Sequence, residues 1–216
     1  MKRAKIKYCG MRTKDSLIYA IDLGIDYLGF IVDFPKSKRS ISVKKFLQTA
    51  EWLKKNKKGK YKIVAVTVDM PIKTMQLLAG NKYVDVIQLH GSETTEAADK
   101  IKGVEVWKVW NDKSKGNGME MSKHVDKILL DSGDADEKAK NNSGEFDAFA
   151  LYKKLVSKKV KVVLSGGLDA KNISSYLKKL NPEIIDISRG IETLPAMKSK
   201  KKMKEFIETV NDYYSA

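Results

Sequence analysis

Short apolar runs alternate with longer amphipathic segments along the whole chain, and this alternation limits the folds open to it. Runs rich in Val, Ile and Leu predict strands at 4–9, 27–32, 63–68, 85–89, 104–109, 127–131, 160–164 and 184–187. Helical periodicity predicts helices at 13–23, 43–56, 72–80, 93–102, 146–157, 171–180 and 199–213. Thr13 and Ser42 stand at expected helix N-caps, and Asp169 precedes another helix start. Only segment 111–125 has a weak pattern.

Strands that alternate with helices of this length form βαβ units and a parallel sheet. Eight repeats without a long linker favour a closed α/β barrel of the (β/α)8 type over an open sheet of six or seven strands. A chain of 216 residues with 42% hydrophobic residues is large enough for one such core. We therefore predict a single barrel domain over residues 1–216.

Cysteine content and hydropathy bear on where such a chain functions. No apolar run approaches the length of a membrane span, and the N-terminal residues lack the apolar core of a signal peptide. The single cysteine, Cys9, cannot form an internal disulfide. We expect a cytoplasmic protein.

The formal net charge of +15 comes mainly from lysine, with clusters at 54–60 and 198–204. One interpretation is a surface that binds nucleic acid by releasing counterions. The other is solvated helix ends, which could also steer anionic substrates. Aromatic residues are not interleaved with the lysines as a base-stacking surface requires, so we favour solvated helix ends.

Glycine-bearing turns follow the last two predicted strands. Ser165-Gly166-Gly167 follows the run at 160–164, and Ser188-Arg189-Gly190 follows the run at 184–187. Glycine lets backbone N–H groups approach an anion, and the start of a helix adds partial positive charge. The loops after strands 7 and 8 of an α/β barrel often bind phosphate. We predict a phosphate site at these turns.

Two residues at strand ends are candidates for acid–base chemistry. Cys9 ends the first predicted strand, before Gly10, and Asp131 ends the sixth. Alternation along a strand places Lys7 on the same face as Cys9, where its charge would favour the thiolate. The alternatives are a small buried cysteine and an aspartate that belongs to a turn. The polar loop 132–145 that follows Asp131 is long enough to be functional.

Other polar residues occupy comparable places. Gln88 and His90 flank the end of the fourth predicted strand, although a lone histidine is usually structural. No histidine or carboxylate pair has metal-ligand spacing, so we expect no metal site. Arg39, after the second strand, carries a planar fork that can bind a carboxylate.

Ordered motifs along nearly the whole chain together resemble one family, phosphoribosylanthranilate isomerase. The N-terminal half contributes Lys7-Tyr8-Cys9-Gly10, Leu28-Gly29-Phe30, Lys36-Ser37-Lys38-Arg39, Val66-Thr67-Val68 and Gln88-Leu89-His90-Gly91. The C-terminal half contributes Ile128-Leu129-Leu130-Asp131, Leu164-Ser165-Gly166-Gly167-Leu168 and Asp186-Ile187-Ser188-Arg189-Gly190-Ile191-Glu192. Each motif alone is weak, but the ordered set is specific.

The resemblance implies a TIM barrel that needs no cofactor and converts phosphoribosylanthranilate to a carboxyphenylamino-deoxyribulose phosphate by an Amadori rearrangement. It implies that Asp131 is the general acid for ring opening and Cys9 the general base at C2′. It also implies that Arg39 holds the anthranilate carboxylate. By the same resemblance, Gln88 and His90 contact the substrate and the turns at Gly166-Gly167 and Ser188-Arg189-Gly190 hold its phosphate.

The chain departs from the family pattern near the phosphate. A lysine, a threonine and a tryptophan that the family usually carries after strand 6 are absent from residues 141–148, where Glu145 is acidic. Arg189 stands where the family has a second serine. Arg189 either supplies the positive charge that the altered loop lacks, or the substrate preference is weakened or changed.

Two other functions remain open. The same barrel could isomerise another phosphorylated sugar, although related barrels do not need both Cys9 and Asp131. A basic barrel that has lost catalysis could instead be a binding protein. The expected partner is a small phosphorylated molecule, without a membrane or nucleic acid, and the chain could be a monomer or a homodimer.

Overall fold

The structure, a computed structural model, describes residues 2–111, 118–131 and 148–216. The polar loop predicted at 132–145 and most of the altered motif at 141–148 lie outside these residues. So do the first two residues of the helix predicted at 146–157.

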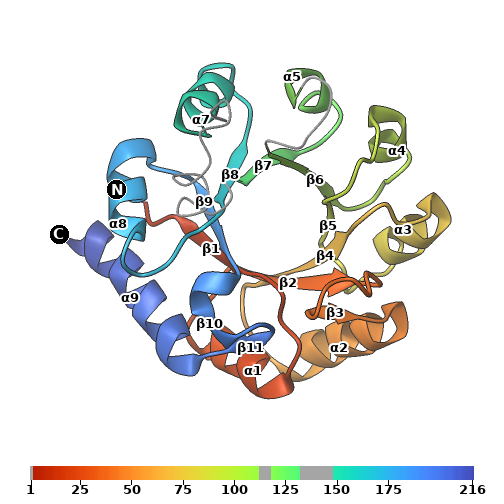
Figure 1. Cartoon of the computed structure of the whole chain (residues 1–216). Helices are drawn as coiled ribbons and strands as arrows, with labels where there is room; N and C mark the ends of the chain where they lie inside the picture. The colour runs from red at the N-terminus through yellow and green to blue at the C-terminus, as the bar shows by residue number, and fades with distance from the viewer. Residues whose placement is uncertain (1, 112–117, 132–147) are drawn as a thin grey trace.

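A closed barrel of parallel strands forms the centre of the molecule (Figure 1). In the described part of the chain its strands are β1 (Lys5–Tyr8), β2 (Tyr27–Val32), β4 (Lys62–Thr67), β5 (Val86–Leu89), β6 (Glu105–Trp110), β7 (Lys127–Asp131), β8 (Val162–Ser165) and β9 (Ile184–Ile187). Each pairs in parallel with its neighbours, and β1 pairs with both β2 and β9, which closes the ring. The predicted barrel is confirmed, and the open sheet is wrong.

Helices surround the barrel on its outside (Figure 1). Those in the described ranges are α1 (Lys14–Asp22), α2 (Val43–Asn56), α3 (Ile72–Ala79), α4 (Thr95–Asp99), α5 (Gly118–Met121), α7 (Ala148–Ser157), α8 (Ile173–Leu180) and α9 (Lys200–Ser215). Thr13 and Ser42 cap α1 and α2 as predicted, because their side chains accept backbone N–H groups of the first turn. Among these helices, none has the length and apolarity needed to cross a membrane.

Two helices are shorter than the sequence predicts. α4 is shorter than the helix predicted at 93–102. It does not include Glu93, because the Glu93 side chain accepts the backbone N–H groups of Asp69 and Gly91 and is held in the preceding loop. α8 begins at Ile173 rather than residue 171, since Asp169 caps a turn before the helix through the N–H groups of Lys171 and Asn172. Side-chain bonds to the backbone therefore shorten both elements.

Three short strands and a 3-10 turn were not predicted. β3 (Ser40–Ile41) pairs in parallel with the end of β2. After β9 the chain forms the turn η1 (Arg189–Ile191) and the antiparallel hairpin of β10 (Glu192–Leu194) and β11 (Met197–Lys198). These segments lie on the C-terminal side of β2 and β9, where an α/β barrel has its active site.

The apolar side chains fall into two cores. One lies between the strands and the helices, and the other fills the barrel. The barrel core consists of Cys9, Tyr27, Val64, Val66, Val86, Trp107, Val109, Leu129, Val163 and Ile184. Because both faces of each strand are covered, the strands are almost continuously apolar. The buried polar side chains Lys7, Gln88 and Asp186 interrupt this pattern.

Candidate active site

The carboxyl ends of the barrel strands bring several predicted site residues to one mouth. Cys9 follows β1 directly, and Asp131 is the last residue of β7. Gln88 is the buried second-last residue of β5, and His90 follows that strand. Parallel strands of a barrel end at the same rim. Residues far apart in the sequence therefore surround one opening.

A cavity of about 380 Å³ lies between the two glycine turns. Its lining comprises Asp131, Ser165, Gly166, Gly167, Leu168, Asp169, Asp186, Ile187, Ser188, Arg189, Gly190 and Lys202. Gly166 and Gly167 have φ values of 95° and 60°, which favour glycine. A Cβ on Gly190 would stand 2.1 Å from the Leu168 carbonyl oxygen, so only glycine allows the two turns to pack this closely.

The Cys9 thiol is buried at this mouth, with 8% of the residue exposed. Burial raises its pKa, whereas the cations Lys7 and Lys198 lower it and Asp186 raises it further. Lys7 lies beside the thiol as the strand alternation predicts. The net change in the pKa is nevertheless upward, because desolvation of the thiolate is the largest effect.

Lys7 is completely buried and forms an ion pair with Asp186, with 2.9 Å between Nζ and Oδ2. Burial would lower the pKa of Lys7, but Asp186 and Cys9 together raise it. A Cβ on Gly29 of β2 would stand 3.0 Å from Lys7 Nζ and 3.1 Å from Cys9 Sγ. The absence of a side chain at Gly29 thus makes room for both groups.

Two buried oxygens at the same mouth have no hydrogen-bond partner within the described residues. They are Oδ1 of Asp186, which lines the cavity, and Oε1 of Gln88. Buried polar atoms are normally paired, because an unpaired one loses its hydration without compensation. Both oxygens therefore keep the capacity to accept a further hydrogen bond.

Arg39 immediately precedes β3 and lies against the backbone next to Cys9. A Cβ on Gly10, whose φ is 73°, would stand 2.7 Å from Arg39 Cδ, so this glycine makes space for the arginine stem. The guanidinium binds Glu192 in a bidentate manner, with Nε to Oε1 at 2.8 Å and Nη2 to Oε2 at 2.5 Å. The predicted carboxylate binder thus already holds a carboxylate of the chain itself.

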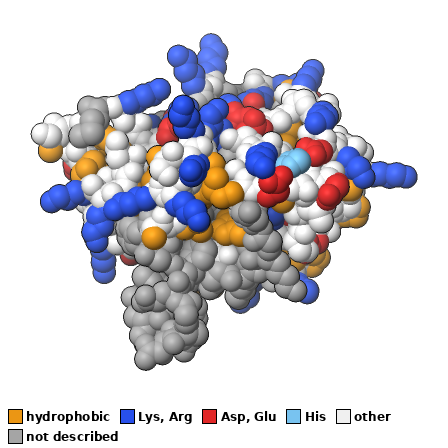
Figure 2. Space-filling model, turned by 90° about the horizontal axis from the view of Figure 1, so that it is seen from above, with side chains coloured by type: hydrophobic (Ala, Val, Ile, Leu, Met, Phe, Trp, Pro, Cys, Tyr) orange, Lys and Arg blue, Asp and Glu red, His pale blue; other side chains and the backbone are white. Residues whose placement is uncertain are grey.

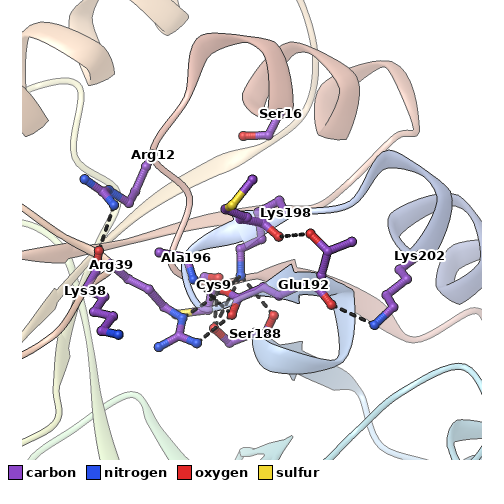
Figure 3. A network of polar contacts seen from close by, with 12 residues as sticks. Cys9, Arg12, Ser16, Lys38, Arg39, Ser188, Glu192, Ala196, Lys198 and Lys202 are labelled. Atoms are coloured by element: carbon purple, nitrogen blue, oxygen red, sulfur yellow. Dashed lines mark hydrogen bonds and ion pairs between the residues drawn. The ribbon is translucent and has the colours of Figure 1, made fainter.

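Glu192 contacts three cations, which lie just before β3, in β11 and in α9 (Figure 3). Lys198 donates to Glu192 Oε1 at 2.8 Å, and Lys202 donates to the Glu192 carbonyl oxygen at 2.7 Å. Burial would raise the pKa of Glu192, but hydrogen bonds from Arg39 and Lys198 lower it. Lys198 also donates to the Ser188 carbonyl oxygen at 2.9 Å, which ties the hairpin to the cavity wall.

His90 is exposed at the rim, and Asp131 lies near enough to influence its charge. Surrounding protein atoms lower the pKa of His90, while Asp131 opposes this effect. A neutral imidazole can both donate and accept a hydrogen bond. His90 is therefore suited to polar contact rather than to serving as a fixed positive charge.

Sequence reasoning missed Asp186, Glu192 and Lys202 as members of this site. A signal existed for Asp186, which is the charged residue of the otherwise apolar strand β9. Glu192 and Lys202 follow the second glycine turn, but their sequence pattern does not indicate which way their side chains point.

The interpretation of residues 198–204 as solvated lysines is wrong for Lys198. Its side chain is 2% exposed, whereas that of Lys201 is 84% exposed. Pairing with Glu192 offsets part of the desolvation of the Lys198 ammonium group. The run thus contains both a buried site residue and solvated surface charges.

A (β/α)8 barrel whose mouth holds a thiol, a carboxyl group and two glycine turns belongs to the barrel enzymes that act on small anionic substrates. The sequence profile of the N-(5′-phosphoribosyl)anthranilate isomerases matches residues 6–209. The chain belongs to the N-(5′-phosphoribosyl)anthranilate isomerase family.

Individual relatives agree with this assignment. The N-(5′-phosphoribosyl)anthranilate isomerase of Caldanaerobacter subterraneus subsp. tengcongensis is 37% identical over 211 residues, which cover 95% of this chain and 97% of the relative. A crystal structure of phosphoribosyl anthranilate isomerase in complex with reduced 1-(o-carboxyphenylamino)-1-deoxyribulose 5-phosphate has a TM-score of 0.76 and 26% identity, covering 97% and 99% of the two chains. Monomers generated from the dimeric Thermotoga maritima enzyme have a TM-score of 0.74 and 27% identity, covering 96% and 98%.

Proposed function

We propose that Cys9 and Asp131 perform the family's isomerisation of phosphoribosylanthranilate as general base and general acid. Asp131 protonates the ribose ring oxygen, so that the bond from this oxygen to C1′ breaks and a Schiff base forms. Cys9, as the thiolate, removes the proton from C2′, and the resulting enolamine tautomerises to the ketone. Each positioned proton transfer of this kind contributes roughly a hundredfold or more to the rate.

The observation that carries this proposal is that the cavity at the glycine turns contains Asp131 and adjoins the backbone of Cys9. Asp131 lines it together with both glycine turns, and the Ser188 hydroxyl in its wall donates to the Cys9 carbonyl oxygen at 3.2 Å. A phosphorylated pentose held at the glycine turns therefore lies beside Asp131, and the second of these turns is bonded to the backbone of Cys9. Such positioning removes several kcal/mol of barrier, on the order of the effects known for oriented reactants.

The remaining predicted site residues hold the substrate. Gly166, Gly167, Ser188 and Gly190 form the phosphate-binding turns, and Arg189 in the second turn supplies positive charge. Arg39 binds the aromatic carboxylate. Gln88 and His90 provide polar contacts at the mouth, for which the buried unpaired oxygen of Gln88 is available. No cofactor is required for these proton transfers.

The distribution of surface charge favours an enzyme that acts on a small anionic substrate over a protein that binds nucleic acid. On the face shown in Figure 2, Lys and Arg side chains are spread out, and Asp and Glu side chains stand among them.

A different phosphorylated sugar is the second candidate substrate. The thiol of Cys9 and the carboxyl group of Asp131, both at the carboxyl ends of barrel strands, favour the anthranilate derivative. We take residues 1–216 as one catalytic domain that acts in the cytoplasm, as a monomer or a homodimer.

Turnover of phosphoribosylanthranilate, followed by the loss of its fluorescence, tests the two roles. We expect Cys9→Ala and Asp131→Asn to lose at least a hundredfold in kcat, since each lacks one proton transfer. Both should still bind the reduced product analogue. Asp126 immediately precedes β7, at the end of the strand opposite to Asp131, and its carboxylate accepts the Val106 N–H. The control Asp126→Asn should therefore keep the wild-type kcat. Fast turnover by both site variants would refute the assignment.

A further inference from the structure

Glu192 is a buried carboxylate shared by two cations at the mouth of the barrel (Figure 3). Its side chain is 5% exposed, and that of Lys198 is 2% exposed, while the Arg39 side chain is 19% exposed. The arginine is therefore the member of this group that solvent or a ligand reaches most easily.

The way in which Glu192 binds Arg39 leaves part of the guanidinium for a second anion. Glu192 takes the Nε hydrogen and one Nη2 hydrogen. An arginine has five N–H donors in a planar fork, so this contact does not use the end formed by Nη1 and the other Nη2 hydrogen. That end has the spacing of a carboxylate.

The charges in this group do not cancel. Arg39 and Lys198 carry two positive charges against the one negative charge of Glu192. An uncompensated buried charge is costly, and an anionic ligand relieves this cost when it binds. Burial lowers the pKa of Lys198, Glu192 opposes this change, and the positive charge of Arg39 lowers the pKa further.

Two further contacts fix the orientation of the group. The backbone N–H of Ala196, in the turn of the β10–β11 hairpin, donates to Glu192 Oε2 at 3.3 Å. On the other side, the stem of Arg39 lies against Gly10, beside Cys9. The hairpin therefore anchors Glu192, and Glu192 in turn anchors the guanidinium next to the candidate base.

We propose that Glu192 is a positioning residue that holds Arg39 for the carboxylate of the substrate, and that discrimination in favour of a carboxylated substrate depends on it. This inference rests on the proposed function. Because Glu192 already fixes the Arg39 side chain, Arg39 loses little conformational freedom when the substrate binds. Such a loss would otherwise reduce the affinity. Lys198 keeps Glu192 ionised and oriented.

A role as a simple neutralising charge predicts the opposite result. If Glu192 only offset the positive charge of Arg39 and Lys198, its removal would strengthen the attraction of any anion to the site. The sign of the change in affinity for a carboxylated ligand therefore separates positioning from neutralisation.

Two variants of Glu192 and two substrates provide the test. Glu192→Gln keeps the size but not the charge, and Glu192→Asp keeps the charge but not the reach to both nitrogens. Each is assayed with phosphoribosylanthranilate and with phosphoribosylaniline, which lacks the carboxylate. Because charged hydrogen bonds are lost, we expect KM for the carboxylated substrate to rise about tenfold or more in both variants. The kcat and KM values for phosphoribosylaniline should stay at those of the wild type.

The control Glu105→Gln removes a carboxylate that also binds two lysines, Lys62 and Lys127, away from the site residues. It should preserve the preference for the carboxylated substrate. An unchanged or increased preference in both Glu192 variants would overturn the inference. If the wild type converted neither substrate, the proposed function would fail. Calorimetric binding of the reduced product analogue, with and without its carboxyl group, would then still decide the role of Glu192 by the same comparison.

Discussion

At the scale of single residues, the site depends on charged side chains removed from water. The buried cations Lys7 and Lys198 both lower the pKa of Cys9, and Asp186 raises it. The charge of the Cys9 thiolate in turn raises the pKa of Arg39. Burial disfavours the thiolate that the proposed mechanism needs, and the cations reduce that cost. Burial therefore raises the pKa of Cys9, the proposed base, and Lys7 and Lys198 oppose this rise.

Ala196 is a residue whose backbone conformation is unfavourable for its type. It follows Pro195 in the turn of the β10–β11 hairpin and has a φ of 70°, which favours glycine. We expect Ala196→Gly to stabilise the protein by about 1 kcal/mol, because the strain of Cβ is removed. Urea unfolding measures this change.

Ala97→Gly, within helix α4, is the matched control and should destabilise the protein by up to about 1 kcal/mol. A lower free energy of unfolding in Ala196→Gly would show that the strain of the Ala196 Cβ does not destabilise the turn.

At the scale of elements, a charged cluster ties three strands together at the start of β6. Glu105 accepts hydrogen bonds from Lys62 of β4 and from Lys127 of β7, the latter at 2.6 Å. Burial would raise the pKa of Glu105, but the bonds from Lys127, Lys62 and Trp107 lower it to about 2. The folded state therefore holds this carboxylate ionised at a pH where the unfolded chain binds a proton.

The sign of the resulting pH dependence follows from this lowered pKa. The contribution of Glu105 to stability is complete above about pH 4.5 and is lost as the pH falls toward 2, on the order of 2 kcal/mol. We expect Glu105→Gln to lose less stability than the wild type between pH 7 and pH 2.5 in urea unfolding. Equal losses in the two proteins would contradict the assigned ion pairs.

The barrel strands were predictable because each is a short apolar run covered on both faces. The segments β3 and β10–β11 were not, since strands of two or three mostly polar residues carry no periodic signal. They nevertheless bring together Arg39, Glu192 and Lys198. Sequence motifs located the ends of the strands, while the ion pairs at the mouth depend on tertiary contacts between segments more than 150 residues apart.

At the scale of the whole molecule, closure of the barrel accounts for the site. Because β1 pairs with β9, Cys9 comes next to the turn at Ser188, and Asp131 at the end of β7 lines the cavity at that turn. The order of the strands around the barrel could be predicted from eight repeats. The upward shift in the pKa of Cys9 could not, since it depends on how completely the fold buries the thiol.

The net charge of +15 acts over the whole surface and should attract a substrate that carries a phosphate and a carboxylate. Salt screens such attraction within about 10 Å at 0.1 M. We expect kcat/KM for phosphoribosylanthranilate to fall about threefold or more between 20 mM and 500 mM NaCl, while kcat stays constant. Initial rates over a range of substrate concentrations measure both constants.

Lys201 and Lys204 offer a control, because their side chains on α9 are 84% and 58% exposed. The double variant Lys201→Gln, Lys204→Gln should show a weaker salt dependence with the same kcat, since it lowers the surface charge and leaves the mouth intact. A kcat/KM that does not change with salt would show that the lysines are only solvated surface groups. Inhibition by duplex DNA at low salt would instead favour a nucleic-acid partner, because polyanion binding weakens steeply as salt is added.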